Sequence, residues 1–187
     1  MINVPTDIGI RELLTDFAPK MAQGVIALSG RAEELNGTRF TLVLDISGDK
    51  VSYDVKNGAE FNVAEGDLDN PMVRIRVSKE DLQKMIETQN LDMLLGIQND
   101  LSRQKYDVLN RLRGTMTAVL ANDDGSTYTI GATFNGAEAP KCSFRMKTTD
   151  SAALIRKEVN PVNLFMSGLM KIEGDMAFAM STQPLFT

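Results

Sequence analysis

Histidine is absent from this chain of 187 residues. Its absence excludes catalytic triads built on histidine, histidine general bases and histidine metal sites. Cysteine is nearly absent as well: Cys142 stands alone, so the chain has no intrachain disulfide and no cysteine cluster for zinc. We therefore expect neither a bound metal nor a cofactor.

Long apolar runs are also missing. None approaches the roughly 20 residues that a helix needs to cross a bilayer. The opening MINVPTDIGIRELL has no basic stretch followed by an apolar run, which a signal peptide would show. These absences predict a cytoplasmic protein with no membrane span.

Positive charge is scarce relative to negative charge. Lys and Arg number 20 and Asp and Glu 25, a formal net charge of −5, which argues against nucleic acid as a partner. The length predicts roughly one domain. With 43% hydrophobic residues, such a chain can form a core without disulfide bonds or a structural metal ion. A homodimer is left open by the sequence.

The first part of the chain has the period of a helix. Apolar residues recur at spacings of three and four from Ile10 to Leu28. Pro19 interrupts this pattern and predicts a break near Phe17–Ala18, with a second helix running to about Leu35.

Period-two alternation then predicts strands, first over 39–46, 51–55, 61–63 and 73–77 and later over 116–120, 128–134, 142–146 and 170–172. A capping box at Ser78 opens a short helix, Leu91, Leu94 and Leu95 indicate a further turn or two, and the pattern from Ile97 to Gly114 predicts another helix. Further helices are expected around 154–155, around 164–165 and after Asp175. Strands followed by helices predict an α+β fold, a mainly antiparallel sheet whose helices cover one face.

Two parts of the chain share an order of elements. The sequence Asn-Gly-Ala-Glu occurs at residue 57 and again at residue 135, between similar strand patterns. We interpret this as a duplicated strand-helix unit, with degenerate copies over about 1–97 and 98–187 that share one core in a single domain, 1–187. Chance similarity of such short anchors is the alternative.

The last third carries a recognisable order of residues. Cys142-Ser-Phe-Arg-Met is followed by Thr149-Asp150, by Asn160-Pro161 with Phe165, and by Lys171-Ile172 leading into Met176-Ala-Phe-Ala-Met180. Over residues 141–182 this resembles the sterol carrier protein type 2 domain family, and residues 38–96 resemble it more loosely. The resemblance implies an α+β, sterol-carrier-like domain that encloses an apolar tunnel for a fatty acid, acyl-CoA, sterol or similar lipid.

No catalytic motif is visible in the sequence. No nucleophile elbow, Walker sequence or glycine-rich phosphate loop occurs, and Cys142 falls on the apolar side of a strand as a small hydrophobic residue. We expect no catalytic residues and no enzymatic activity. An enzyme that uses carboxylates alone is a third reading, behind a lipid carrier and an interaction module.

The methionines indicate where a ligand would lie. Four of the 11 fall in the last 22 residues, and Met176 and Met180 share one helix face. Together with the resemblance, this predicts an apolar cavity that the C-terminal helix closes. Its predicted ligand-binding residues are Met146, Phe165, Met166, Met176, Met180 and Phe186. The alternative is a structural or accessory module of lipid metabolism, in which the same helix plugs a filled core.

Overall fold

The computed structural model describes residues 3–187, apart from the side chains of 97–99. Its first half runs α1 (Ile10–Glu12), the π-helix η1 (Leu13–Phe17), α2 (Ala18–Leu28), α3 (Arg31–Glu34), β1 (Arg39–Ile46), β2 (Asp49–Lys56), β3 (Glu60–Glu65), β4 (Val73–Val77), α4 (Lys79–Glu87) and α5 (Asp92–Asn99). The second half runs α6 (Arg103–Arg111), β5 (Gly114–Ala121), β6 (Thr127–Phe134), β7 (Lys141–Lys147), α7 (Thr148–Ile155), α8 (Pro161–Met166), β8 (Lys171–Gly174), α9 (Met176–Thr182) and the 3₁₀-helix η2 (Gln183–Phe186).

All the strands belong to one sheet. Its order is β3-β2-β1-β4-β6-β5-β7-β8, so strands from both halves of the chain meet where β4 pairs with β6. Within the described residues β1 pairs parallel to β4 and β5 parallel to β7, and the other five pairings are antiparallel. The α+β fold with a mainly antiparallel sheet is confirmed.

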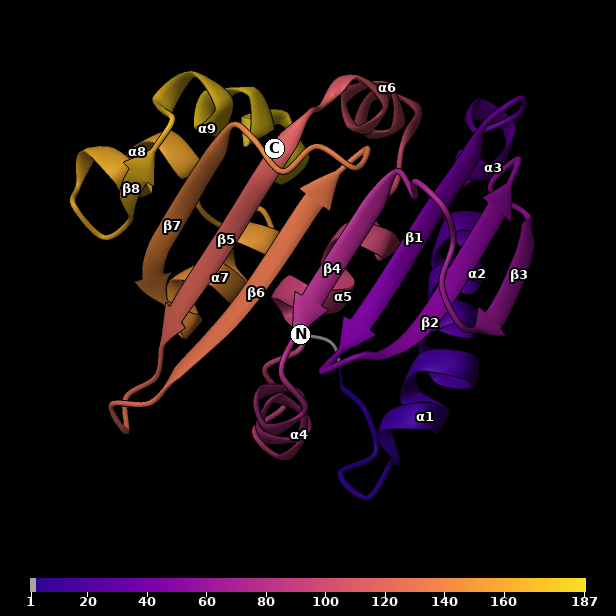
Figure 1. Cartoon of the computed structure of the whole chain (residues 1–187), viewed down its shortest axis with the longest axis horizontal. Helices are drawn as coiled ribbons and strands as arrows, with labels where there is room; N and C mark the ends of the chain where they lie inside the picture. The colour runs from indigo at the N-terminus through magenta and orange to yellow at the C-terminus, as the bar shows by residue number, and fades with distance from the viewer. Residues whose placement is uncertain (1–2) are drawn as a thin grey trace.

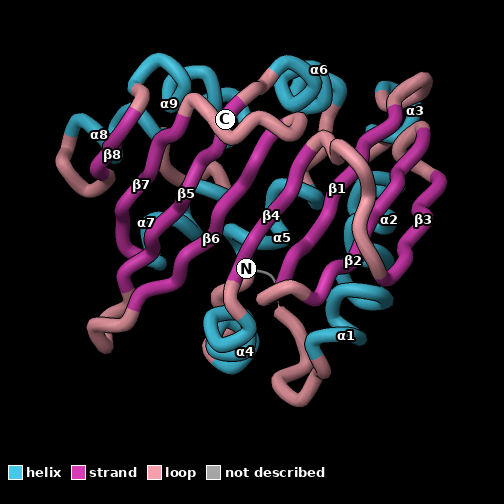
Figure 2. The backbone as a smooth tube through the Cα atoms, viewed as in Figure 1, coloured by secondary structure: helices cyan, strands magenta, loops and turns pink. Residues whose placement is uncertain are grey.

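The helices lie against one face of this sheet (Figure 1). The α2, α5 and α7 helices lie behind the strands in that view, and the opposite face is turned toward the viewer. Figure 2 shows the same two layers as a backbone tube. The core fills the space between the layers with apolar side chains of both halves, among them Leu42, Leu44, Leu94 and Leu120. No helix in residues 3–187 is long and apolar enough to cross a membrane.

Pro19 marks a helix boundary at the predicted position, but the chain does not leave the helical conformation there. The α2 helix begins at Ala18, which confirms the boundary, and Pro19 lies in its first turn, where a missing N–H costs little. The preceding residues stay helical, because the π-helical turn Leu13–Phe17 connects α1 to α2 without a loop. The second helix ends at Leu28, not near Leu35, because Gly30 adopts a left-handed φ of 72°.

The prediction of a helix from Ile97 to Gly114 was wrong about where that helix begins. The α5 helix continues through Asn99, and α6 begins at Arg103 after Ser102, whose hydroxyl accepts a hydrogen bond from the Lys105 N–H at 3.2 Å. The helical turns expected around Leu91–Leu95 are thus part of the longer helix α5, and the next helix starts later than predicted. The capping box at Ser78 is confirmed: its hydroxyl accepts from the Asp81 N–H at 3.0 Å.

The two halves connect their strands in the same way. In the first half the hairpin β1–β2 is followed by β4, parallel to β1, and in the second the hairpin β5–β6 is followed by β7, parallel to β5. In both halves a helix follows the parallel strand directly, α4 after β4 and α7 after β7. A shared origin by duplication, with units over 1–97 and 98–187, stays a prediction.

Candidate functional site

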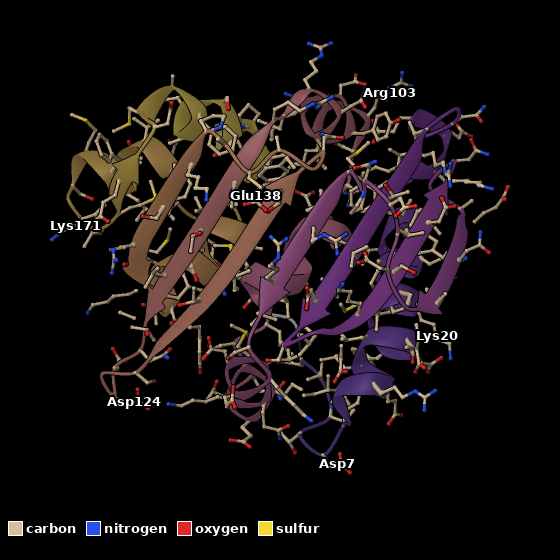
Figure 3. The ribbon with its side chains drawn as sticks, in the orientation of Figure 1. Asp7, Lys20, Arg103, Asp124, Glu138 and Lys171 are labelled. Carbon is tan, nitrogen blue, oxygen red and sulfur yellow. The ribbon has the colours of Figure 1, made fainter. Side chains whose placement is uncertain are left out.

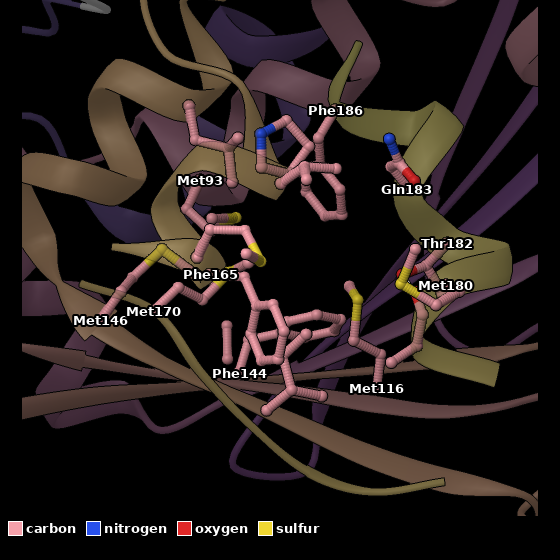
Figure 4. A pocket seen from close by; sticks show the side chains of 17 residues that line it. Met93, Met116, Phe144, Met146, Phe165, Met170, Met180, Thr182, Gln183 and Phe186 are labelled. Carbon is pink, nitrogen blue, oxygen red and sulfur yellow. The ribbon is translucent and has the colours of Figure 1, made fainter. Parts of the chain in front are cut away.

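An apolar cavity of about 250 Å³ lies in the second half of the molecule (Figure 4). Its floor is formed by strands β5, β7 and β8, and its walls by helices of the C-terminal region together with one residue of α5. The lining residues are Met93, Met116, Ala118, Phe144, Met146, Leu154, Pro161, Val162, Phe165, Met166, Met170, Ile172, Ala179, Met180, Thr182, Gln183 and Phe186.

The floor follows from the register of three strands. Ala118 of β5 lies opposite Phe144 of β7, which in turn lies opposite Ile172 of β8. Side chains two residues apart share one face of a strand, so Met116 and Met146 join the same surface. The small side chain of Ala118 beside these long ones leaves room above the strand.

The α9 helix is anchored at its start and in its first turn. Asp175 caps it, since its carboxylate accepts a hydrogen bond from the Phe178 N–H at 2.8 Å. The Phe178 ring meets Phe134 edge to face with ring centroids 6.4 Å apart. Gly114 permits this packing, because a Cβ there would lie 2.7 Å from the Phe178 ring and its φ is 141°.

The segment after α9 is held by a buried lysine. Lys105 of α6 donates from Nζ to the backbone carbonyl of Leu185 at 2.9 Å and to the Asp100 carboxylate at 2.5 Å. The Lys105 side chain is only 7% exposed. Phe186, the next residue after Leu185, lines the cavity, so this contact fixes one wall of the site.

Two further basic side chains form ion pairs with Asp100, next to its contact with Lys105. Arg31 lies 3.1 Å and Lys157 2.9 Å from its carboxylate oxygens. Burial raises the pKa of Asp100, but the hydrogen bonds from Lys105 and Lys157 outweigh it and leave that pKa below its ordinary value. Burial lowers the pKa of Lys105, and the Asp100 carboxylate partly offsets that effect.

The lining offers almost no polar group. Thr182 is committed within its own helix, because its hydroxyl donates to the Ala179 carbonyl at 2.7 Å. Gln183 is half-buried at the wall. No charged side chain is among the lining residues in the described part of the chain. The cavity can therefore hold an apolar group, and only Gln183 brings side-chain polarity that is not already used.

The basic residues Arg145 and Lys171, which neighbour the cavity floor in the sequence, do not face the cavity. Arg145 and Lys171 face each other across β7 and β8, on the opposite side of the sheet from the cavity floor. Arg145 lies 3.6 Å from Glu173, and Lys171 points outward at the edge of the sheet (Figure 3). Neither residue lines the cavity.

Reactive groups are scarce among the described residues. Cys142 is buried, and burial, helped by the negative charge of Asp175, raises the pKa of its thiol to about 11, so it stays protonated at neutral pH. Among the described residues no group of three or more Cys, Asp and Glu side chains is arranged to hold a metal ion.

The structure brings together five of the six residues predicted for the site. Met146, Phe165, Met166, Met180 and Phe186 line the cavity, but Met176 does not. Met176 lies in the first turn of α9, one turn before Met180, and is 44% exposed. Ligand binding by these residues stays a prediction.

The sequence did not lead us to predict the lining residues Met116, Ala118 and Met93. Met116 and Ala118 share the strand alternation that placed Met146, so the floor could have been extended to β5 from sequence. Met93 lies in α5, in the first half of the chain, and no local pattern connects it with the C-terminal helices.

The second half of the chain is similar to a known protein family. Residues 97–187 match the model of the SCP-2 sterol transfer family. No curated protein matches the chain significantly. Among solved structures, apo sterol carrier protein 2 from Yarrowia lipolytica is 20% identical over 42% of this chain and 76% of its own, with a TM-score of 0.35. The solution structure of sterol carrier protein domain 2 of Helicoverpa armigera is 24% identical over 56% of this chain and 84% of its own, with a TM-score of 0.37.

The matched residues contain most of the cavity. Every lining residue except Met93 lies within 97–187. The family model also spans the stretch 141–182 on which the resemblance was based, so that resemblance is confirmed. Residues 97–187 of this chain are therefore similar to the SCP-2 sterol transfer family.

Proposed function

We propose that this protein binds and carries an apolar lipid in the cavity beneath α9, without transforming it chemically. The observation that carries the proposal is a cavity of about 250 Å³ with no charged side chain among the described residues that line it. Protein interiors are close-packed, and voids larger than a water molecule are few. A space of this size that is almost wholly apolar favours a carrier over a module with a filled core.

The ligand is a chain-like lipid whose polar end stays at the mouth. Burial of each methylene stabilises the complex by about 0.8 kcal/mol, so affinity comes from the alkyl chain and needs no charged anchor. A fully buried charged head group would find no partner on this lining and would be costly. A fatty acid, an acyl-CoA or a sterol-like molecule with its head left in water meets these requirements.

The C-terminal segment is the proposed closure. Met180 and Phe186 line the cavity from α9 and η2, and the contact from Lys105 to the Leu185 carbonyl holds that segment on the body of the protein. The proposal of a non-catalytic role rests on the protonated Cys142 thiol and on a lining whose described residues include no charged side chain.

The first test is native mass spectrometry of the purified protein for co-purified lipid, followed by titration with a fluorescent fatty acid. Met180→Lys places a charge at the cavity wall and is expected to weaken binding at least tenfold. Met176→Lys is the matched control, since it changes a similarly exposed methionine on the same helix face that does not line the cavity.

Removal of residues 175–187 should weaken fatty-acid binding far more than it unfolds the sheet, because it takes away the proposed closure but no sheet strand. The proposal is wrong if the intact protein carries no lipid and binds neither fatty acid, acyl-CoA nor sterol at micromolar concentrations. It is also wrong if the two lysine variants lose affinity equally while both remain folded.

A further inference from the structure

Methionine is concentrated in the lining of the cavity. Six of the 17 lining residues are methionines, whereas the whole chain has 11 in 187 residues. Figure 4 shows their thioether groups approaching the enclosed space from several sides. The six come from α5, β5, β7, α8, the turn before β8 and α9: Met93, Met116, Met146, Met166, Met170 and Met180.

These methionines differ in their exposure to solvent. Met166 and Met180 are exposed, so an oxidant dissolved in water reaches them directly. The other four are buried, and a molecule inside the cavity lies against them. We call these four the buried cavity methionines: Met93, Met116, Met146 and Met170.

The thioether group keeps its reactivity in an apolar cavity. It is a nucleophile without losing a proton, unlike the Cys142 thiol, whose pKa is raised to about 11 by burial and by the charge of Asp175. A peroxide transfers one oxygen atom to methionine and forms methionine sulfoxide, which methionine sulfoxide reductases convert back. Among the described residues of the lining, no other type of side chain is readily oxidised in this way.

We propose that the buried cavity methionines reduce lipid hydroperoxides that bind in the cavity. The sulfur attacks the terminal oxygen of the hydroperoxide, the O–O bond breaks, and an S=O bond forms. The hydroperoxide proton passes to the oxygen that stays on the lipid, which becomes an alcohol. The sulfur is oxidised by two electrons and the hydroperoxide is reduced by two. Each methionine reacts once, so the reaction is stoichiometric and lipids without a peroxide are carried unchanged.

The inference rests on the proposed function, because the lipid must first lie in the cavity. In a space of about 250 Å³ an enclosed chain touches the lining on all sides, and about one lining residue in three is a methionine. A peroxide on the enclosed part of the chain is therefore held next to a thioether. Such proximity raises the effective concentration of one reactant at the other, to roughly 10⁵ M or more in well-oriented cases.

The experiment compares two oxidants and follows the oxygen content of each methionine by peptide mass spectrometry. One equivalent of the 13-hydroperoxide of linoleic acid, whose peroxide lies toward the methyl end of the chain, is expected to oxidise the buried cavity methionines at least tenfold faster than Met85 or Met176. These two are the internal controls, since Met85 is buried, Met176 is exposed and neither lines the cavity. Hydrogen peroxide should give the reverse order, with Met166, Met176 and Met180 oxidised first. An excess of palmitic acid should protect the buried cavity methionines from the lipid hydroperoxide.

A variant separates reactivity from packing, because methionine also suits an irregular cavity by its flexibility alone. Met116→Leu with Met146→Leu keeps the floor apolar and similar in volume but removes two sulfurs. Its initial rate of hydroxy-acid formation, counted per bound hydroperoxide, should fall at least twofold. Met85→Leu is the control and should reduce the bound hydroperoxide at the rate of the parent.

Binding of unoxidised linoleic acid, measured in parallel, distinguishes this inference from the proposed function. If linoleic acid binds but the bound hydroperoxide stays intact, the reduction is refuted and the carrier stands. The reduction is also refuted if the lipid hydroperoxide oxidises Met85 or Met176 as fast as the buried cavity methionines, if palmitic acid gives no protection, or if the double variant reacts at the rate of the parent. A chain that binds neither linoleic acid nor its hydroperoxide refutes both proposals.

Discussion

The size of the cavity predicts how long an alkyl chain it can enclose. An apolar protein cavity of about 150 Å³ accepts benzene, which corresponds to roughly 25 Å³ per carbon. The cavity of about 250 Å³ would therefore enclose about ten carbons. Affinity for saturated fatty acids should rise about fourfold for each added methylene, the equivalent of about 0.8 kcal/mol, and then level off near ten enclosed carbons.

A single substitution should change the chain length at which affinity stops rising, which we call the break. Ala118 lies on the cavity floor opposite Phe144, and Ala118→Leu adds three carbons to the enclosed space. The break should shift to about seven carbons, and a ten-carbon chain should lose about 2.4 kcal/mol of binding free energy, or about fiftyfold in Kd. Thr117→Leu is the control, since the neighbouring side chain on β5 points to the other face of the sheet.

The measurement is isothermal titration or fluorescence displacement with a fatty-acid series that extends well below and well above ten carbons. Urea unfolding of both variants shows whether each is folded, because overpacking a core costs roughly 1–3 kcal/mol where the added group does not fit. Affinity that rises through the whole series without a break would contradict the reasoning. So would a break at the same length in Ala118→Leu and in the parent.

Three further predictions follow from the contacts around the cavity. Lys105→Met removes the hydrogen bond to the Leu185 carbonyl and should cost about 1–3 kcal/mol in urea unfolding while it speeds release of bound fatty acid; unchanged release would show that this contact does not hold the closing segment. The pKa of Asp100 lies below its ordinary 3.8, so its stabilising effect is present above that pH and is lost as pH falls through the lowered pKa; the Tm of Asp100→Asn should therefore fall less than that of the parent on acidification below about pH 4. The Cys142 thiol, with a pKa of about 11, should resist iodoacetamide at pH 8 in the native protein and react on denaturation, and rapid native labelling would contradict its burial.

Much of the sheet could be predicted because strand alternation is a local signal. The period-two pattern of 39–46 matches β1 from end to end, and the Cys142–Met146 alternation matches β7 within one residue at each end. The same holds for helix starts whose cap lies in the adjacent sequence, as at Ser78 and Asp175. Each of these features depends on residues only a few positions apart.

Helix boundaries without such a signal were less predictable. Apolar spacing alone continued one helix from Ile97 to Gly114, although the chain leaves the helix after Asn99 and starts again at Arg103. Leu101 in the connecting segment is buried against other parts of the molecule, so its apolar character reflects tertiary packing rather than a helix face.

By itself, then, the sequence determined the strands and the C-terminal concentration of methionines, because hydrophobic period and composition are properties of neighbouring residues. Only the tertiary structure decided that β4 pairs with β6 and that Met93 joins the cavity. It also decided that Lys105 reaches the Leu185 carbonyl, 80 residues away. Such contacts join segments with no shared local pattern, and they form because a folded chain must bury its apolar faces and pair its buried polar groups wherever in the sequence the partners lie.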